Sequence, residues 1–143
     1  MSYANGLDVV KLDVNSAAGQ SITTTGDKLF YAPPKRMIIR QMVVTVTTAT
    51  TAADPCTIAL EHRPTAGSDA GRIQSGIPTV TIPGGSAAGT VWYKANLSYE
   101  VDPGEQIVVD VTDASAAGAA SIAMVVEWSP QVPGNFAIMT ASA

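Results

Sequence analysis

Short runs of alternating apolar and polar residues, separated by proline and glycine, recur along most of the chain. The segment EQIVVDVT is representative, since from Ile107 to Val111 every second residue is apolar and only Val108 interrupts the polar series. A period of two sends successive side chains to opposite faces of a strand, whereas an amphipathic helix needs apolar residues three and four positions apart. That helical spacing is almost absent here. The alternation therefore predicts an all-β protein.

Residues 36–48 form the longest candidate strand, and its centre is apolar on both sides, as in a strand inside a packed sandwich. The alternation assigns Met37, Ile39 and Val43 to one face and Ile38, Met42, Val44 and Val46 to the other.

Turn-forming residues such as Pro33-Pro34 and Asp102-Pro103-Gly104 bound the candidate strands. Eight or nine strands at this spacing, without helices, predict a sandwich or barrel. A jelly roll of two four-stranded sheets is our first choice, and an immunoglobulin-like sandwich is the second. The other candidate strands are residues 7–14, 20–24, 28–32, 56–63, 79–82, 90–95, 105–112 and 120–128.

The length of 143 residues is that of one domain, and we find no internal repeat. We divide the chain into an N-terminal arm or first strand (1–15), a β-sandwich (16–129) and an extended C-terminal tail (130–143). Both ends carry apolar residues without obvious partners, so we expect them to make contacts between subunits. The alternative is that the tail closes one end of its own sandwich. The expected interface residues are Leu7, Val9, Val10, Phe136, Ile138 and Met139.

Charge limits the classes of partner. Charged residues make up 14% of the chain, below the ~25% of an average globular protein, and the net charge is −4. No basic run exceeds Lys35-Arg36, which argues against nucleic acid. No apolar run reaches the length of a membrane span, and residues 1–30 lack the pattern of a signal peptide. We therefore expect no membrane partner and synthesis in a reducing cytoplasm.

The search for catalytic or metal-binding chemistry predicts neither. His62 is the single histidine, and Glu61 and Arg63 lie on the opposite face of its strand, where they cannot orient it. Cys56 begins an apolar stripe and is expected to be a core thiol. The loop 63–76 lacks the carboxylate spacing of a calcium loop and is expected to make contacts. We expect no enzymatic activity, no cofactor and no metal.

Two tryptophans raise the alternative of a carbohydrate- or receptor-binding module from a phage tail or a bacterial protein. Trp92 lies on one face of its strand with Lys94, while Tyr93 lies on the other. Trp128 continues an apolar stripe and is expected at the core or its rim. Aromatic residues make up 6% of the chain, which is low for a protein that displays several of them to sugars.

The second half of the chain resembles a known class of proteins. The runs NLSYEVDPGEQIVVDVTDASAAG and VVEWSPQVPGN, and the closing MTASA, are similar to the small β-sandwich head decoration (cement) proteins of tailed bacteriophages. The resemblance spans residues 96–143 and is a pattern of turns and strands without a catalytic signature. It implies a structural virion protein that assembles in the host cytoplasm, binds the major capsid protein on the outside of the capsid, and forms a homotrimer.

Overall fold

The computed structural model describes residues 6–13, 18–51, 53–63 and 78–129. Within these residues the backbone forms ten strands and no helix, which confirms the all-β prediction. The strands are β1 (Leu7–Lys11), β2 (Gln20–Ser21), β3 (Gly26–Tyr31), β4 (Met37–Thr48), β5 (Cys56–Arg63), β6 (Thr79–Ile82), β7 (Val91–Lys94), β8 (Tyr99–Val101), β9 (Gln106–Asp113) and β10 (Ala119–Trp128).

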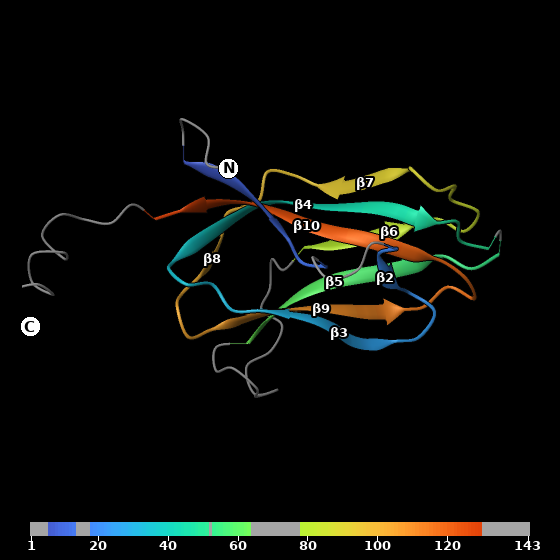
Figure 1. Ribbon diagram of the computed structural model, residues 1–143, viewed down its shortest axis with the longest axis horizontal. Coiled ribbons are helices and arrows are strands. Elements are labelled where there is room, and N and C mark those ends of the chain that lie inside the picture. The colour runs from blue at the N-terminus through green and yellow to red at the C-terminus, as the bar shows by residue number, and fades with distance from the viewer. Residues whose placement is uncertain (1–5, 14–17, 52, 64–77, 130–143) are drawn as a thin grey trace, which may run out of the picture.

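The strands form two antiparallel sheets that pack face to face (Figure 1). The six-stranded sheet has the order β1-β10-β4-β7, with β2 also beside β10 and β8 also beside β4, and the four-stranded sheet has the order β3-β9-β5-β6. Since β1 and β2 share one edge and β7 and β8 the other, the ten strands fill eight positions. Along the sequence, the pair β1–β10 encloses β3–β9, which encloses β4–β7, which encloses β5–β6. Successive pairs alternate between the two sheets. This is the jelly roll that the sequence predicted as first choice.

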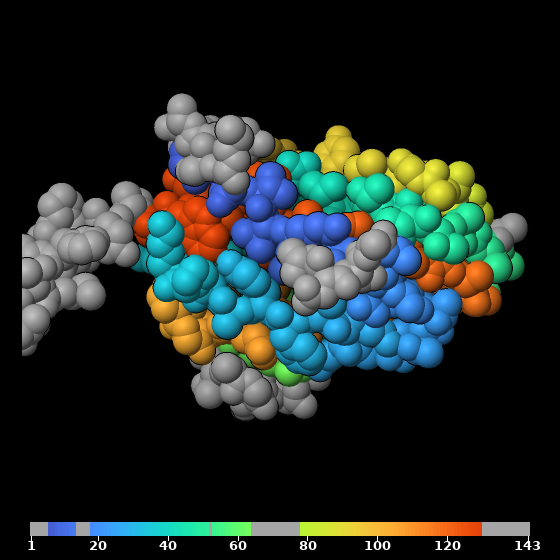
Figure 2. Space-filling model, viewed as in Figure 1, coloured from blue at the N-terminus to red at the C-terminus, as the bar shows by residue number. Residues whose placement is uncertain are grey.

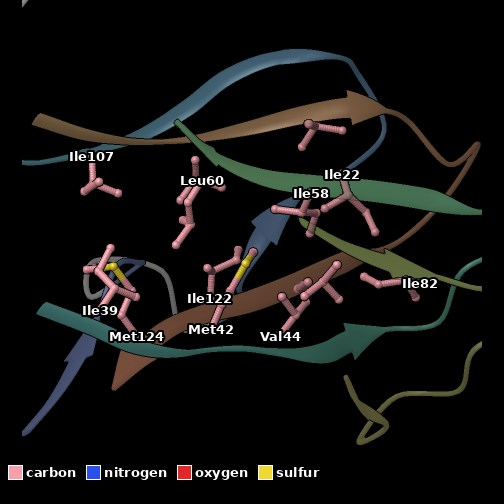
Figure 3. Close-up of a cluster of buried hydrophobic side chains, with 14 of the residues drawn as sticks. Ile22, Ile39, Met42, Val44, Ile58, Leu60, Ile82, Ile107, Ile122 and Met124 are labelled. Carbon is pink, nitrogen blue, oxygen red and sulfur yellow. The ribbon is translucent and has the colours of Figure 1, made fainter. Parts of the chain in front are cut away.

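The core lies between the sheets, as Figure 3 shows for its largest side chains. Ile58 and Leu60 of β5 point toward Met42 of β4 and Ile122 of β10, and all four are fully buried. Each comes from a strand with an apolar period of two, so the alternation read from the sequence becomes the inward face of a sheet. The remaining buried core residues include Ile22, Met37, Ile39, Val44, Val46, Cys56, Val80, Ile82, Val101, Ile107, Val109, Val111, Ala120, Met124 and Val126.

A β-bulge in β4 changes the face assignment that we predicted for this strand. Val126 pairs with Ile39, but the preceding Val125 pairs with Gln41, so Arg40 has no cross-strand partner in β10. The extra residue resets the alternation. Met37 and Ile39 therefore face the core together with Met42, Val44 and Val46, and the predicted grouping of Met37 and Ile39 with Val43 was wrong.

The first strand forms an edge of the six-stranded sheet by pairing with β10. Its atoms (dark blue) lie at the surface in Figure 2. Leu7 pairs with Glu127, and the pairing continues along β10 as far as Lys11. The chain just after β1 is also attached to β10. The carboxylate of the buried Asp13 accepts hydrogen bonds from the Ile122 N–H and the Ser121 hydroxyl, each at 3.1 Å. The tail 130–143 and the expected contact loop, from residue 64 onward, lie outside the described residues.

Candidate functional site

An apolar strip crosses the outer face of the six-stranded sheet, from β1 at one edge to β7 at the other. Paired residues of adjacent strands lie on the same face, so the register places these side chains together. Three of them are open to solvent: Val9 and Val91 are each 51% exposed, and Tyr93 is 63% exposed. A solvated sheet face normally carries polar residues, so these exposed apolar side chains make this face the candidate interaction surface. The strip runs diagonally through Val9, Val125, Ala123, Val43, Tyr93 and Val91, and the same register places Lys11, Gln41, Thr45 and Ser121 beside it on this face.

Ion pairs border the strip on the side where β4 begins. Arg36 contacts Glu100 and lies 3.4 Å from Asp102, while Arg40 lies 2.7 Å from Glu127. These ion pairs lower the cost of covering this side of the strip, while the exposed Lys11, which pairs with Ala123, is a cation that a partner would also meet. An apolar centre with a polar rim is the usual anatomy of a protein–protein interface.

Beside this rim the outer face is hollowed to a volume of about 650 Å³. The bulge at Arg40 and the break between β7 and β8 create the hollow. Here the chain turns through Asn96, which has a φ of 59°, and Leu97 donates its N–H to the Arg40 carbonyl at 3.0 Å. Val125 belongs to both features, so the hollow continues the strip. The hollow is lined by Leu7, Ala95, Leu97 and Val125 and by the polar residues Arg40, Gln41, Asn96, Ser98 and Glu127.

The expected interface residues of the N-terminal segment are divided between the two faces of β1. Val9 belongs to the strip, and Leu7 lines the hollow. Val10 lies on the opposite face, half-buried against the core. Phe136, Ile138 and Met139 lie outside the described residues.

His62 contacts residues outside its own strand, which the pattern of that strand did not reveal. Its Nδ1 lies 2.8 Å from the Tyr99 hydroxyl of β8, and its Nε2 lies 3.1 Å from Oε1 of Glu105. Glu105 is positioned by the predicted turn: its N–H donates to the Asp102 carbonyl at 3.1 Å, and Gly104 between them has a φ of 87°. This proline–glycine turn has the chemistry of type II. His62 therefore ties the two sheets together at one end of the sandwich.

The electrostatics of this group favour a structural tie over catalysis. His62 Nδ1 and the Tyr99 hydroxyl share a hydrogen bond whose donor depends on the tautomer, and Nε2 lies beside the Glu105 carboxylate. Burial, with a smaller contribution from the Glu105 charge, raises the pKa of the Tyr99 phenol above its ordinary value of 10.0. A nucleophilic tyrosine needs the opposite shift.

A charge cluster that is mostly buried lies on the outer face of the four-stranded sheet. Glu61 and Arg63 lie on the face of β5 opposite His62, as predicted, and they are only 0% and 4% exposed. Arg63 contacts Asp27, lies 3.8 Å from Glu61 and stacks 5.7 Å from the centre of the Phe30 ring. The Asp27, Glu61 and Asp110 carboxylates lie within 4.8 Å of one another, and the Arg63 guanidinium supplies positive charge beside them.

Cys56 and the tryptophans occupy structural positions. Cys56 is fully buried, and burial, helped by the Asp113 charge, raises the pKa of its thiol to about 11. Trp92 pairs with Val44 on the inner face and packs against the core. Trp128 also packs against the core, and its indole N–H donates to Asp8 at 3.2 Å. Asp8 also accepts a hydrogen bond from the Val9 N–H. The Trp128 bond first, and the Val9 bond second, lower the pKa of the Asp8 carboxyl below its usual value.

No protein-family model and no curated protein sequence matches this chain. Among solved structures, the chain is similar to the structure of Eiger TNF from S. frugiperda, with 13% identity, a TM-score of 0.39 and 92% of each chain covered. A likeness this distant carries no argument about binding or assembly. The described residues contain no helix with the length and apolarity that a membrane crossing requires.

Proposed function

We propose that this chain is a decoration (cement) protein, a structural subunit that binds the outer surface of a phage capsid and stabilises it. In this proposal it is not an enzyme and uses no cofactor. It assembles in the host cytoplasm, acts as a homotrimer on the virion, and contacts the major capsid protein. The single observation that carries the proposal is the apolar strip, with its rim of paired charges, on the outer face of the six-stranded sheet.

The strip suits many weak and repeated contacts. Full burial of a large apolar side chain contributes ~1.5–3 kcal/mol, so the exposed parts of Val9, Val91 and Tyr93 contribute ~1 kcal/mol each. One subunit therefore binds weakly, since association carries an entropy cost of several kcal/mol. A trimer that engages three equivalent sites gains avidity, and the symmetry of a capsid provides such sites.

The strip favours a protein partner, and the resemblance of residues 96–143 to cement proteins suggests which protein. The strip is largely aliphatic, with Tyr93 as its exposed ring, and such a face matches an apolar protein surface, whereas sugars are usually held by several aromatic rings that face solvent. Trp92, the aromatic residue on which the carbohydrate alternative relied, packs against the core. We therefore place the major capsid protein ahead of a glycan as the partner.

Co-sedimentation tests this proposal. The chain is mixed with capsids assembled from the major capsid protein encoded beside it. We expect the wild-type protein to sediment with the capsids, and Tyr93→Asp to bind at least tenfold more weakly because the strip would bury an unpaired charge. Thr81→Asp is the matched control, since it adds the same charge at an exposed position on β6 of the other sheet. Failure of the wild-type protein to bind, or equal binding of Tyr93→Asp, would overturn the proposal.

A further inference from the structure

We infer that the hollow beside Arg40 receives the C-terminal segment, residues 130–143, of a second copy of this chain. Exchanged segments would then link the copies. The inference rests on the proposed function for the expectation that copies associate. It adds the receiving site and the ligand, which is an uncharged apolar peptide.

The hollow offers an apolar patch beside a neutralised ion pair. Leu7, Leu97 and Val125 supply the apolar surface, and Arg40 donates to Glu127 from two nitrogens, at 2.7 and 3.0 Å. Its volume of about 650 Å³ lies within the ~300–1,000 Å³ range of ligand sites. A charged ligand would have to compete with the existing pair, whereas an apolar side chain does not.

The segment 130–143 has the matching chemistry. Its sequence, PQVPGNFAIMTASA, contains no Asp, Glu, Lys, Arg or His. It carries Phe136, Ile138 and Met139 close together, so two or three large side chains can enter one site. Burial of such side chains is favourable by ~1.5–3 kcal/mol each.

The segment leaves the sandwich at the rim of the hollow. β10 ends at Trp128, and the Ser129 N–H donates to the Arg36 carbonyl at 3.0 Å. Glu127, two residues before that anchor, lines the hollow. Every copy therefore presents its segment next to its own hollow, and the question is which hollow the segment enters.

Proline placement favours the hollow of another copy. A residue before proline is driven toward extended backbone, so Pro130 and Pro133 oppose a reversal before Pro133-Gly134. A hairpin turned there would set Phe136 opposite Gln131, beyond the end of β10. The returning chain could not then run beside β10, because β1 and β4 occupy both of its edges.

An extended segment reaches a neighbour readily. At roughly 3.3–3.6 Å per residue, Phe136 lies up to ~25 Å from Ser129, which is comparable to the diameter of a small domain. At full extension the apolar group can therefore reach the hollow of a neighbouring copy.

Disulfide trapping between two differently tagged copies tests the inference without any capsid. One copy carries Ser98→Cys at the hollow, and the other carries Ala137→Cys. The native Cys56 stays in place because it is fully buried. We expect a mixed disulfide to form under mild oxidation, at least tenfold more than when Thr81→Cys on β6 replaces Ser98→Cys. Equal trapping at both positions, or a disulfide only within a copy that carries both cysteines, would overturn the inference.

Sedimentation velocity of the full chain, measured without capsids, supplies a second readout. We expect Phe136→Ser with Ile138→Ser to shift the protein toward monomer, while Gln131→Ser leaves its oligomeric state unchanged. An unchanged state in the double variant would contradict the inference. If the disulfide forms but the protein does not bind capsids, the exchanged segment stands and the proposed function falls. If the protein binds capsids but no disulfide forms, the proposed function stands and the exchanged segment falls.

Discussion

Arg40 holds one carboxylate oxygen of Glu127 from two directions, with Nε at 3.0 Å and Nη2 at 2.7 Å. Arg40 is the bulged residue of β4, and Glu127 is on the neighbouring strand β10. The pair therefore bridges the irregularity that creates the hollow, and it fixes the direction of the arginine side chain. The bulge resets the alternation at Arg40, and the ion pair then positions the polar side chains that border the strip.

We expect the coupling between Arg40 and Glu127 to be small. Their side chains are 37% and 38% exposed, and pairs this accessible contribute ~0.5–1 kcal/mol. A double-mutant cycle with Arg40→Met and Glu127→Gln, followed by urea denaturation, measures the coupling free energy. A value above ~3 kcal/mol would show that the pair maintains the bulge itself.

Removal of the His62 imidazole should loosen the join between the sheets. His62→Ala removes a buried ring and its bond to Tyr99, so we expect the free energy of unfolding to fall by ~1–3 kcal/mol. Tyr99→Phe, which removes only the hydroxyl, should cost ~1 kcal/mol. Capsid binding by the folded fraction should persist in both variants. Loss of binding with the β circular dichroism intact would assign His62 a direct functional role.

Arg63 should matter far more than the ion pairs of the rim. Arg63→Met leaves the fully buried Glu61 carboxylate, and the partly exposed Asp27 carboxylate, without their neighbouring guanidinium, and loss of one partner of a buried ion pair costs ~3–5 kcal/mol. Arg36→Met, at an exposed pair, is the control and should cost less than ~1 kcal/mol. Chemical denaturation of both variants checks the difference, and equal losses would contradict the burial of this cluster.

Alkaline pH should destabilise the fold through Cys56. Its thiol has a pKa raised from 9.0 to about 11, so the folded state favours the neutral form. This stabilisation is fully present below pH 9 and is lost as the pH rises through 11, by ~2 kcal/mol at pH 11. Because the pKa of Tyr99 is also raised, some alkaline loss should remain in Cys56→Ala. Identical pH profiles of unfolding free energy for the wild-type protein and Cys56→Ala would contradict this assignment.

The fold class could be predicted because its signals are local. Alternation marks the strands, and turns such as Asp102-Pro103-Gly104-Glu105 mark their ends. β8 was missed because its three residues lie within a segment that reads as turn chemistry. The bulge at Arg40 was also missed, because it is defined by the pairing of β4 with Val125 and Val126, which lie far from Arg40 in the sequence.

The site was harder to predict for the same reason. Val9 could be singled out as an apolar residue near the start of the chain, but its neighbours in the strip, Val43 and Tyr93, become neighbours only through sheet order. His62 lacked a partner on its own strand, and its actual partners come from β8 and the turn that follows it. Patterns within a strand reveal faces, whereas a surface built from four strands requires the topology.

Cryo-electron microscopy of capsids that carry the chain would reveal which face of the jelly roll meets the capsid protein. We expect density on the outer surface of the capsid, with the outer face of the six-stranded sheet against the capsid protein and Tyr93 in the contact. Bound chains that meet the capsid through the four-stranded sheet, with Tyr93 and Val91 still in solvent, would contradict this expectation.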